Sequence, residues 1–331
     1  MAMHPFEHAH APSIEAAVEV LNETCRPVAG GTDLVAMMKE GLVAPERLVN
    51  LKTIAGLGEI DEREDGWHIG ALTTLSALAG DDGLRAQPAL AALVQAADAS
   101  ASPQLRHMGT LGGNLVQRPR CWYFRNRHVP CWRKGGRKCF AFRGENKYHT
   151  IMGRGPCYAV HPSDPAVALL ALDASVVLTG PEGERTLPLA AFYRPPAPDV
   201  QRANGYHPVT VLAPNELITE VVIPRPEERT TSVYVKKMER GDWDFALVSV
   251  AVRLRMSEET VAGAKIALGG GATIPWLRDE AAEALVGAPL TEDAVQAAAD
   301  AAVADARPLE HNAYKVDLLK GAIKQALRAL I

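Results

Sequence analysis

RPVAGGTDLVAMMKEG (residues 26–41) predicts a short strand, a tight turn and a helix in succession. Glycines between a strand and a helix let successive backbone N–H groups face an anion, and the helix N-terminus adds a favourable dipole. The stretch contains neither GxGxxG nor GxxxxGK[ST], so it does not indicate a Rossmann dinucleotide site or a P-loop. An ordinary Gly-Gly turn of an α/β protein is the alternative. The candidate binding residues are Val28, Ala29, Gly30, Gly31, Thr32, Asp33 and Leu34.

A second Gly-Gly turn lies in the motif TLGGN (residues 110–114). Two separated loops of this kind can clamp a pyrophosphate from two sides, although their spacing does not name the ligand. The candidate residues in this loop are Thr110, Gly112, Gly113 and Asn114.

Apolar periodicity along the rest of the chain predicts an α/β fold with a division near residues 224–230. The expected helices are 13–22, capped by Ser13, then 88–99, 164–174, 276–286, 291–305 and 315–329. The expected strands include 47–51, 67–71, 158–160, 175–180, 216–224, 231–240, 245–256 and 260–270, and residues 102–115 are expected to form a polar loop.

Composition sets further limits on function. The chain has 331 residues, 47% of them hydrophobic, and a net charge of −4. No apolar run approaches the roughly 20 residues that a membrane-spanning helix needs, so we expect no membrane insertion. The N-terminus lacks the basic and apolar regions of a signal peptide, so we expect a cytoplasmic protein with reduced thiols.

Charge and cysteine are concentrated in one segment, residues 118–157. Residues 118–154 carry eight Arg and three Lys against one acid, Glu145, which gives a local net charge of +10. Four of the five cysteines lie in the same segment, namely Cys121, Cys131, Cys139 and Cys157.

Three interpretations of these cysteines compete. Structural zinc sites usually pair cysteines as CxxC-like knuckles, which are absent here, and disulfides suit exported proteins. A [4Fe–4S] cluster accepts irregular spacing if a loop wraps around it, and nearby Arg and Lys would offset its negative charge and donate hydrogen bonds to its sulfurs. We therefore favour the cluster. The alternative from a different class is a zinc-containing nucleic-acid-binding protein, which a steep salt dependence of DNA binding would support.

Several motifs resemble the flavin-binding subunit of the molybdenum hydroxylases, a family that includes xanthine dehydrogenase, aerobic carbon monoxide dehydrogenase and 4-hydroxybenzoyl-CoA reductase. These motifs are AGGTD (29–33), TLGGN (110–114), HPSD (161–164), ELITEVVIP (216–224), ALGGGATIPW (267–276) and NAYKVDLLKGAIKQAL (312–327). The run QRPRCWYFR (117–125) is similar to a narrower branch, the bacterial three-subunit aldehyde oxidoreductases whose flavin subunit also holds a [4Fe–4S] cluster.

The resemblance implies an FAD-binding domain of the PCMH/vanillyl-alcohol-oxidase type over residues 1–224. It would have a first subdomain to about residue 60, a second over 61–224, and the cluster insertion at 118–157. A smaller α/β domain of the CO dehydrogenase flavoprotein type would follow over residues 230–331. By the same resemblance both glycine loops bind the FAD pyrophosphate, and the further cofactor-binding candidates are His107, Asp164, Ile218 and Lys236.

The resemblance also implies an oxidoreductase subunit without a catalytic side chain of its own, because the cofactor carries the redox chemistry. The molybdenum cofactor would lie on a large partner subunit and two [2Fe–2S] clusters on a small one, with FAD passing electrons to an external acceptor. A xanthine dehydrogenase-like or 4-hydroxybenzoyl-CoA reductase-like complex is the alternative to an aldehyde oxidoreductase. Periplasmic co-export with a partner that carries a twin-arginine signal is the alternative to the cytoplasm.

Overall fold

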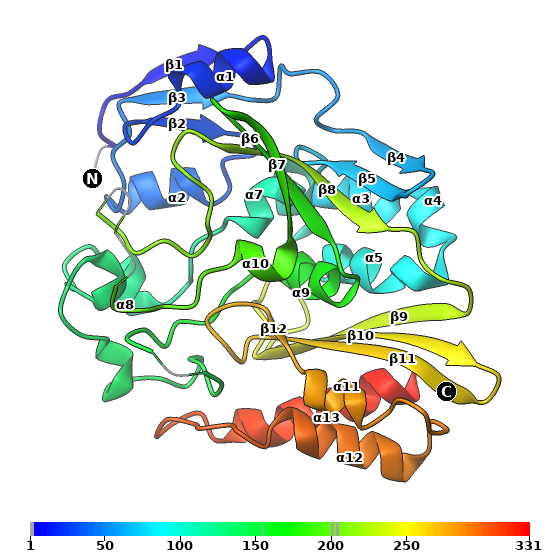
Figure 1. Ribbon diagram of the computed structural model, residues 1–331. Helices are drawn as coiled ribbons and strands as arrows, with labels where there is room; N and C mark the ends of the chain where they lie inside the picture. Colours follow the sequence, from blue (N-terminus) through cyan, green and yellow to red (C-terminus); the bar gives the residue numbers. More distant parts are fainter. Residues whose placement is uncertain (1–2, 154, 200–201, 203–204) are drawn as a thin grey trace.

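The computed structural model describes residues 3–153, 155–199, 202 and 205–331. Its secondary structure is mixed α/β, with three sheets built from successive parts of the chain (Figure 1). The N-terminal sheet and the middle sheet lie above the C-terminal sheet in this view, and helices α11 to α13 form the lowest layer.

The N-terminal sheet is parallel and has the order β1-β3-β2. Its strands are β1 (Glu7–His10), β2 (Cys25–Val28) and β3 (Arg47–Asn50), and its helices are α1 (Ile14–Val20) and α2 (Leu34–Lys39). Ser13 caps α1 as predicted, because its hydroxyl oxygen accepts a hydrogen bond from the Ala16 backbone N–H at 3.2 Å. Parallel strands need crossover connections, so β2 ends at the first glycine loop and α2 starts directly after it.

The middle sheet is antiparallel, in the order β4-β5-β8-β6-β7. Its strands are β4 (Ile60–Arg63), β5 (Gly66–Gly70), β6 (Ser175–Gly180), β7 (Gly183–Pro188) and β8 (Leu217–Pro224). The helices of this part are α3 (Leu75–Gly80), α4 (Asp82–Arg85), α5 (Ala91–Asp98), α6 (Pro103–Met108), α7 (Leu111–Leu115), α9 (Asp164–Ala171) and α10 (Leu189–Phe192), with a 3₁₀ turn, η1 (Pro88–Leu90), before α5. Every residue of α9 is buried, which agrees with its apolar sequence after Asp164.

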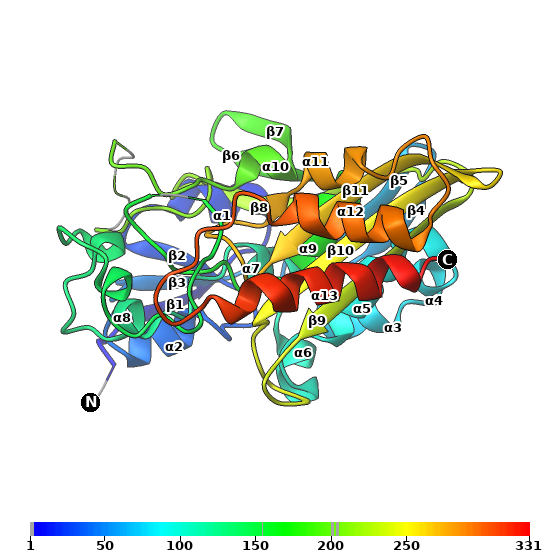
Figure 2. The same ribbon diagram turned by 90° about the horizontal axis from the view of Figure 1, so that it is seen from below.

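The C-terminal sheet is antiparallel, in the order β12-β11-β10-β9. Its strands are β9 (Thr230–Lys237), β10 (Val248–Ser257), β11 (Thr260–Gly269) and β12 (Trp276–Leu277). One face packs on α5 and α9, and α11 (Asp279–Glu283), α12 (Glu292–Ala302) and α13 (Tyr314–Arg328) cover the other (Figure 2). Along β10, Val250 and Val252 join the core under α12 and α13, whereas Ala251 joins the central core, as the two-residue period of a strand requires.

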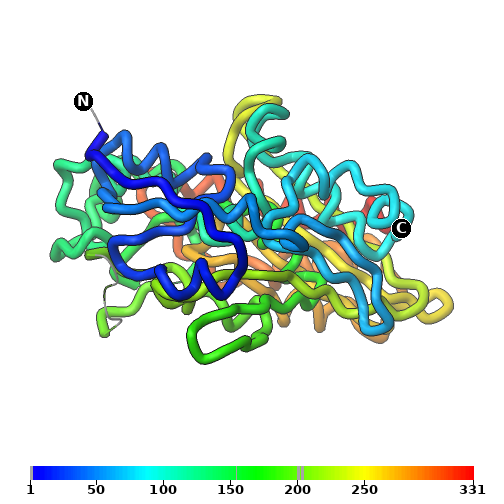
Figure 3. The backbone as a smooth tube through the Cα atoms, turned by 90° about the horizontal axis from the view of Figure 1, so that it is seen from above, coloured from blue at the N-terminus to red at the C-terminus, as the bar shows by residue number. Residues whose placement is uncertain are grey.

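We call residues 118–157 the cysteine excursion. It holds the short helix α8 (Trp122–Arg125) and the 3₁₀ turns η2 (Trp132–Lys134) and η3 (Phe140–Phe142). It lies at the same end of the molecule as the N-terminal sheet, beside α2 (Figure 3). A hydrogen bond of 2.5 Å from the Ser163 hydroxyl to the Asn114 side-chain oxygen joins the segments from which the excursion leaves and to which it returns.

Three local expectations are wrong. Residues 158–160 form no strand, because the Tyr158 carbonyl accepts a hydrogen bond from Thr150 within the excursion instead of from a sheet. The expected loop 102–115 contains α6 and α7, whose N-caps Ser102 and Thr110 offset the helix-breaking effect of the glycines. Residues 276–277 are β12, so the helix expected over 276–286 occupies 279–283.

Candidate functional site

The two glycine loops touch each other. A Cβ atom on Gly30 would lie 1.8 Å from the carbonyl oxygen of Met108, so the first loop packs directly on the backbone that leads into the second. Gly31 has a φ of +70°, a conformation that glycine adopts without strain. In the second loop the Thr110 hydroxyl oxygen accepts a hydrogen bond from the Gly113 N–H at 3.3 Å and caps α7. Both turns therefore follow the local chemistry that the sequence predicts.

The loops open on a cleft made of two adjoining cavities, of about 250 and about 110 Å³. Both cavities are lined by Thr32, Asp33, Thr110, Gly113 and Gln117. The larger one is also lined by the rest of the first loop, by Arg118, and by parts of the segment 206–216. The smaller one is also lined by Ser100, Asn114, Asp164, Trp243 and Phe245. The arrangement suits an elongated ligand with an anionic middle.

Arg118 places a positive charge at the larger cavity. Burial, together with the neighbouring cations Arg133 and Arg26, lowers the pKa of Arg118 to about 10. The guanidinium still carries its charge at neutral pH. It lies over the Tyr206 ring at 5.7 Å from the ring centroid, which defines one wall of the cavity.

The Asp33 carboxylate connects the first glycine loop to the cysteine excursion. It accepts a hydrogen bond from the Arg118 backbone N–H at 2.8 Å and forms ion pairs with Arg125, at 2.7 Å, and with Arg120. The side chain is 17% exposed, so these charges are partly shielded from water. Asp33 makes no side-chain hydrogen bond to the start of α2. Its role in this structure is to hold the excursion against the loop.

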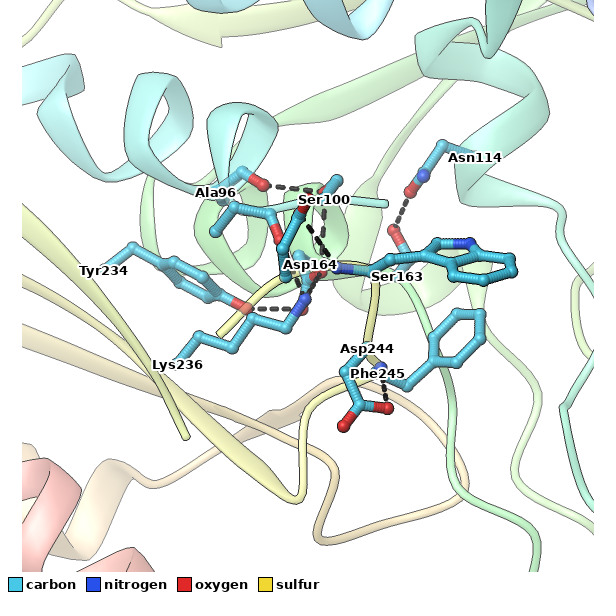
Figure 4. Close-up of polar contacts among 12 residues, drawn as sticks. Ala96, Ser100, Asn114, Ser163, Asp164, Tyr234, Lys236, Asp244 and Phe245 are labelled. Carbon is cyan, nitrogen blue, oxygen red and sulfur yellow. Dashed lines mark hydrogen bonds and ion pairs between the residues drawn. The ribbon is translucent and has the colours of Figure 1, made fainter. Parts of the chain in front are cut away.

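Asp164 belongs to a buried polar network at the smaller cavity (Figure 4). Its carboxylate accepts hydrogen bonds from the Tyr234 hydroxyl at 2.5 Å, from the Lys236 ammonium at 2.9 Å and from the Ser100 hydroxyl at 3.4 Å. Burial, followed by the Asp164 charge, raises the pKa of Tyr234 well above its usual value. Both oxygens of the Asp164 carboxylate thus accept a hydrogen bond, as a buried charge requires.

The remaining sequence candidates lie in different places. Lys236 reaches the cleft through its ion pair with Asp164, whereas Gly112 packs against Ala71 behind the second loop. His107 is exposed on α6 and Ile218 is buried in β8, and neither lines the cavities. Sequence reasoning missed several lining residues. No motif surrounds Ser100, Tyr206, Trp243 and Phe245, and Arg118 lies in the run 117–125, which was assigned to the cysteine segment rather than to the cofactor.

All four cysteines of the excursion line one small cavity, which they share with Arg133 and four apolar or aromatic residues. Burial raises the pKa of Cys131 and Cys139, and it raises that of Cys121 to about 12, with smaller contributions from neighbouring cysteines. These thiols are therefore protonated at neutral pH unless a cation compensates their charge.

Two hydrogen bonds reach the sulfurs. The Arg133 Nε–H donates to the Cys157 Sγ at 3.3 Å, and a ring nitrogen of His149, Nε2, lies 3.2 Å from the Cys121 Sγ. Arg133 Nη1 and His149 Nδ1 are buried without a hydrogen-bond partner among the described residues. Unpaired buried polar atoms beside thiols are consistent with an anionic group. Nevertheless, no set of three or more His, Cys, Asp or Glu side chains in the described part of the chain is arranged to hold a metal ion.

Comparisons with known proteins identify the family. Residues 4–226 match the model of the FAD binding domain in molybdopterin dehydrogenase, and residues 233–330 match the CO dehydrogenase flavoprotein C-terminal domain. The chain belongs to the FAD-binding subunits of the molybdenum hydroxylases. The fold class and the family that the motifs predicted are thereby confirmed, and this flavin subunit is part of an oxidoreductase complex of the molybdenum hydroxylase type.

Individual relatives cover nearly the whole flavin subunit. The aldehyde oxidoreductase FAD-binding subunit PaoB of Escherichia coli K12 is 37% identical over 304 residues, 91% of this chain and 89% of that protein. The carbon monoxide dehydrogenase medium chain of Hydrogenophaga pseudoflava is 31% identical and covers 98% of this chain and 96% of its own. The solved structure of reconstituted CO dehydrogenase from Oligotropha carboxidovorans superposes with a TM-score of 0.77 at 28% identity, covering 99% of this chain and 98% of that one.

FAD binding by this subunit follows from the family, and the cleft fits the cofactor. Two loops meet at its middle, and their glycines have no side chain that would fill the space. A Cβ on Gly30 would strike the backbone that leads into the other loop. The described residues include no helix with the length and apolar character needed to cross a membrane.

Proposed function

We propose that this flavin subunit transfers electrons within an aldehyde oxidoreductase. The observation that carries the proposal is the pair of adjoining cavities on which both glycine loops open. The loop residues Ala29 to Asp33 and Thr110 to Asn114 would hold the pyrophosphate of FAD, with Arg118 supplying positive charge nearby. Asp164, oriented by Lys236 and Tyr234, would contact the cofactor in the smaller cavity. FAD supplies the redox chemistry when bound, and the protein positions it and shields it from water.

The glycine-loop assignment is tested by Gly113→Asp in the purified complex. A Cβ on Gly113 would meet only the Thr110 hydroxyl, at 3.0 Å, so the new carboxylate points into the cleft and repels the pyrophosphate. We expect loss of the flavin absorbance and of bound FAD. Gly58→Asp is the matched control, because nothing lies within 4 Å of a Cβ at that position. Normal flavin content in Gly113→Asp would contradict the assignment.

We also propose that Cys121, Cys131, Cys139 and Cys157 hold a [4Fe–4S] cluster. The support is their common cavity, the hydrogen bonds from Arg133 and His149 to two of the sulfurs, and the positive charge of the excursion. Thiols with raised pKa values lose their protons when iron binds, so cluster assembly would release protons and would weaken at low pH.

The ligand assignment is tested by Cys139→Ser, with Cys25→Ser as the control. Cys25 is also a buried free thiol, but it lies in β2 outside the excursion. We expect Cys139→Ser to lose four irons per flavin and the low-temperature EPR signal of the reduced cluster in this subunit, while Cys25→Ser keeps four irons per flavin beyond those of the partner clusters. Unchanged iron and EPR signals in Cys139→Ser would refute the assignment.

The proposed circuit needs two partners. A large molybdopterin subunit would oxidise the aldehyde, and a small subunit with two [2Fe–2S] clusters would deliver the electrons that leave this subunit for an external acceptor. The name of the PaoB relative supports an aldehyde as the substrate of the complex. The carbon monoxide dehydrogenase and xanthine dehydrogenase relatives make other substrates the second candidate. Turnover of aldehydes, but not of carbon monoxide or xanthine, by the purified complex separates these.

We further propose that the chain divides at residues 224–230, with a cofactor domain before and a smaller domain after. The two family matches, which end at 226 and begin at 233, support this division. Limited proteolysis of the apoprotein provides the test, since a division elsewhere would give fragments of other sizes.

A further inference from the structure

The basic residues of the cysteine excursion fall into two groups by burial. Most side chains project into water or are half-buried, as expected for charged groups. The exposed ones are Arg127, Arg137, Lys138, Arg143 and Lys147. Among the described basic residues of the excursion, Arg133 is the least exposed, with 2% of its surface exposed, whereas Arg118 is half-buried. The net charge of the segment therefore does not show that Arg133 has a different environment from the other basic residues.

Arg133 lies at the wall of the four-thiol cavity. Its Nε–H donates to the Cys157 Sγ at 3.3 Å, while Nη1 is buried without a partner in the described structure. The neighbouring backbone is fixed: the Arg133 carbonyl accepts a hydrogen bond from the His207 N–H at 3.0 Å, and the Trp132 ring stacks on the His207 ring at 3.7 Å. The backbone at Arg133 is thus anchored to His207, and the guanidinium lies 6.0 Å from the centroid of the Trp132 ring.

Arg133 has no carboxylate counter-charge among the described residues. Its ion-pair partners would be carboxylates, and none of the described Asp and Glu side chains lies within 4.0 Å of it. A guanidinium keeps its proton at neutral pH, so a buried one remains a positive charge there. Buried charges are normally compensated by an opposite charge or a metal site. The groups beside Arg133 that can become negative are the thiols of the cavity.

We propose that Arg133 is the positioning residue that sets the reduction potential of the four-cysteine centre. The inference rests on the proposed [4Fe–4S] cluster and adds that one buried arginine, rather than the exposed bases, tunes it. One-electron reduction adds a negative charge to the centre, and a fixed cation beside a ligand sulfur stabilises the reduced form. Exposed arginines are screened by water and ions and contribute little.

The test is a potentiometric titration of the assembled enzyme, followed by EPR of the reduced cluster. Arg133→Met removes the charge and the donor at similar volume, Arg133→Lys keeps the charge, and Arg143→Met removes an exposed charge from the same segment. We expect Arg133→Met to lower the equilibrium constant for cluster reduction at least tenfold, equivalent to 59 mV. Arg133→Lys should recover at least half of that shift, and Arg143→Met should change the constant less than twofold. The flavin potential, measured in the same samples, should stay constant.

The outcomes separate this inference from the cluster proposal. Wild-type enzyme without a four-iron cluster in this subunit would remove the cluster proposal and this inference with it. A four-iron cluster whose reduction is unchanged in Arg133→Met would overturn the role of Arg133 alone. If Arg133→Met binds flavin but loses iron, the Arg133→Lys variant separates the explanations. Retention of iron in Arg133→Lys, which keeps the positive charge, supports the inference, and loss of iron from both variants overturns it.

Discussion

Gly30→Ala tests how closely the two glycine loops must approach. The added methyl group would lie 1.8 Å from the Met108 carbonyl oxygen and 2.6 Å from its carbon, whereas ordinary contacts begin at 3.4 Å. The loops must therefore separate by about 1.6 Å, and neither contact can be relieved by rotating a side chain because both atoms are backbone.

Overpacking of this kind costs about 1–3 kcal/mol, and contact with backbone places Gly30→Ala near the upper value. We expect the free energy of unfolding of the apoprotein to fall by about 3 kcal/mol. Because the same displacement widens the cleft between the loops, the dissociation constant of FAD should rise at least tenfold.

Urea unfolding of the apoprotein and fluorescence titration with FAD measure the two effects separately. Gly58→Ala is the control, since a Cβ there meets nothing within 4 Å and φ is not in the left-handed region. That variant should stay within about 0.5 kcal/mol of wild type. If Gly30→Ala matched Gly58→Ala in both stability and FAD affinity, the close approach of the loops would not be a requirement of the site.

Three further predictions concern buried charges. Burial lowers the pKa of Lys315 from 10.5 to about 7. Between these pH values the unfolded chain binds more protons than the folded protein, so the free energy of unfolding should rise by up to about 1.4 kcal/mol per pH unit, relative to Lys315→Met. Equal pH profiles of the two proteins in urea unfolding would contradict this. Asp33→Asn removes the carboxylate that pairs with Arg120 and Arg125 and leaves Arg125 with its longer ion pair to Glu40, at 3.6 Å, so it should cost about 3 kcal/mol and speed trypsin cleavage in the excursion. Glu239→Gln breaks an exposed ion pair and should cost under about 1 kcal/mol; equal costs would refute the anchoring role. Lys236→Met should lower the free energy of unfolding by about 3–5 kcal/mol, because it leaves the buried Asp164 carboxylate without its ion pair. Tyr234→Phe, which removes one hydrogen bond to the same carboxylate, should lower it by about 1–3 kcal/mol. The reverse order would argue against the ion pair as the main contact of Asp164.

The sequence predicted those parts of the site that depend on local chemistry. The turn at Gly31 depends on backbone conformation alone, so its motif places it. The second glycine turn was predicted too, but the helix that Thr110 caps was expected to be loop. The cap at Ser13 and the start of α1 were predicted as well. The family followed from motifs spread over the chain and is confirmed by the two family matches.

Contacts between distant residues required the tertiary structure. The ion pairs of Asp33 with Arg120 and Arg125, and its hydrogen bond from the Arg118 N–H, join residues more than eighty positions apart and are not visible in the sequence. The wall formed by residues 206–216 carries no motif and became part of the cleft only through the path of the chain.

Local sequence thus determined the turns, the inventory of thiols and charges, and membership of the family, because turn geometry and residue chemistry act over a few positions. Tertiary structure alone decided which of the many arginines is buried beside the thiols, with no carboxylate of the described residues next to it. Burial and counter-charge are properties of the surroundings, and those surroundings are assembled from segments that lie far apart along the chain.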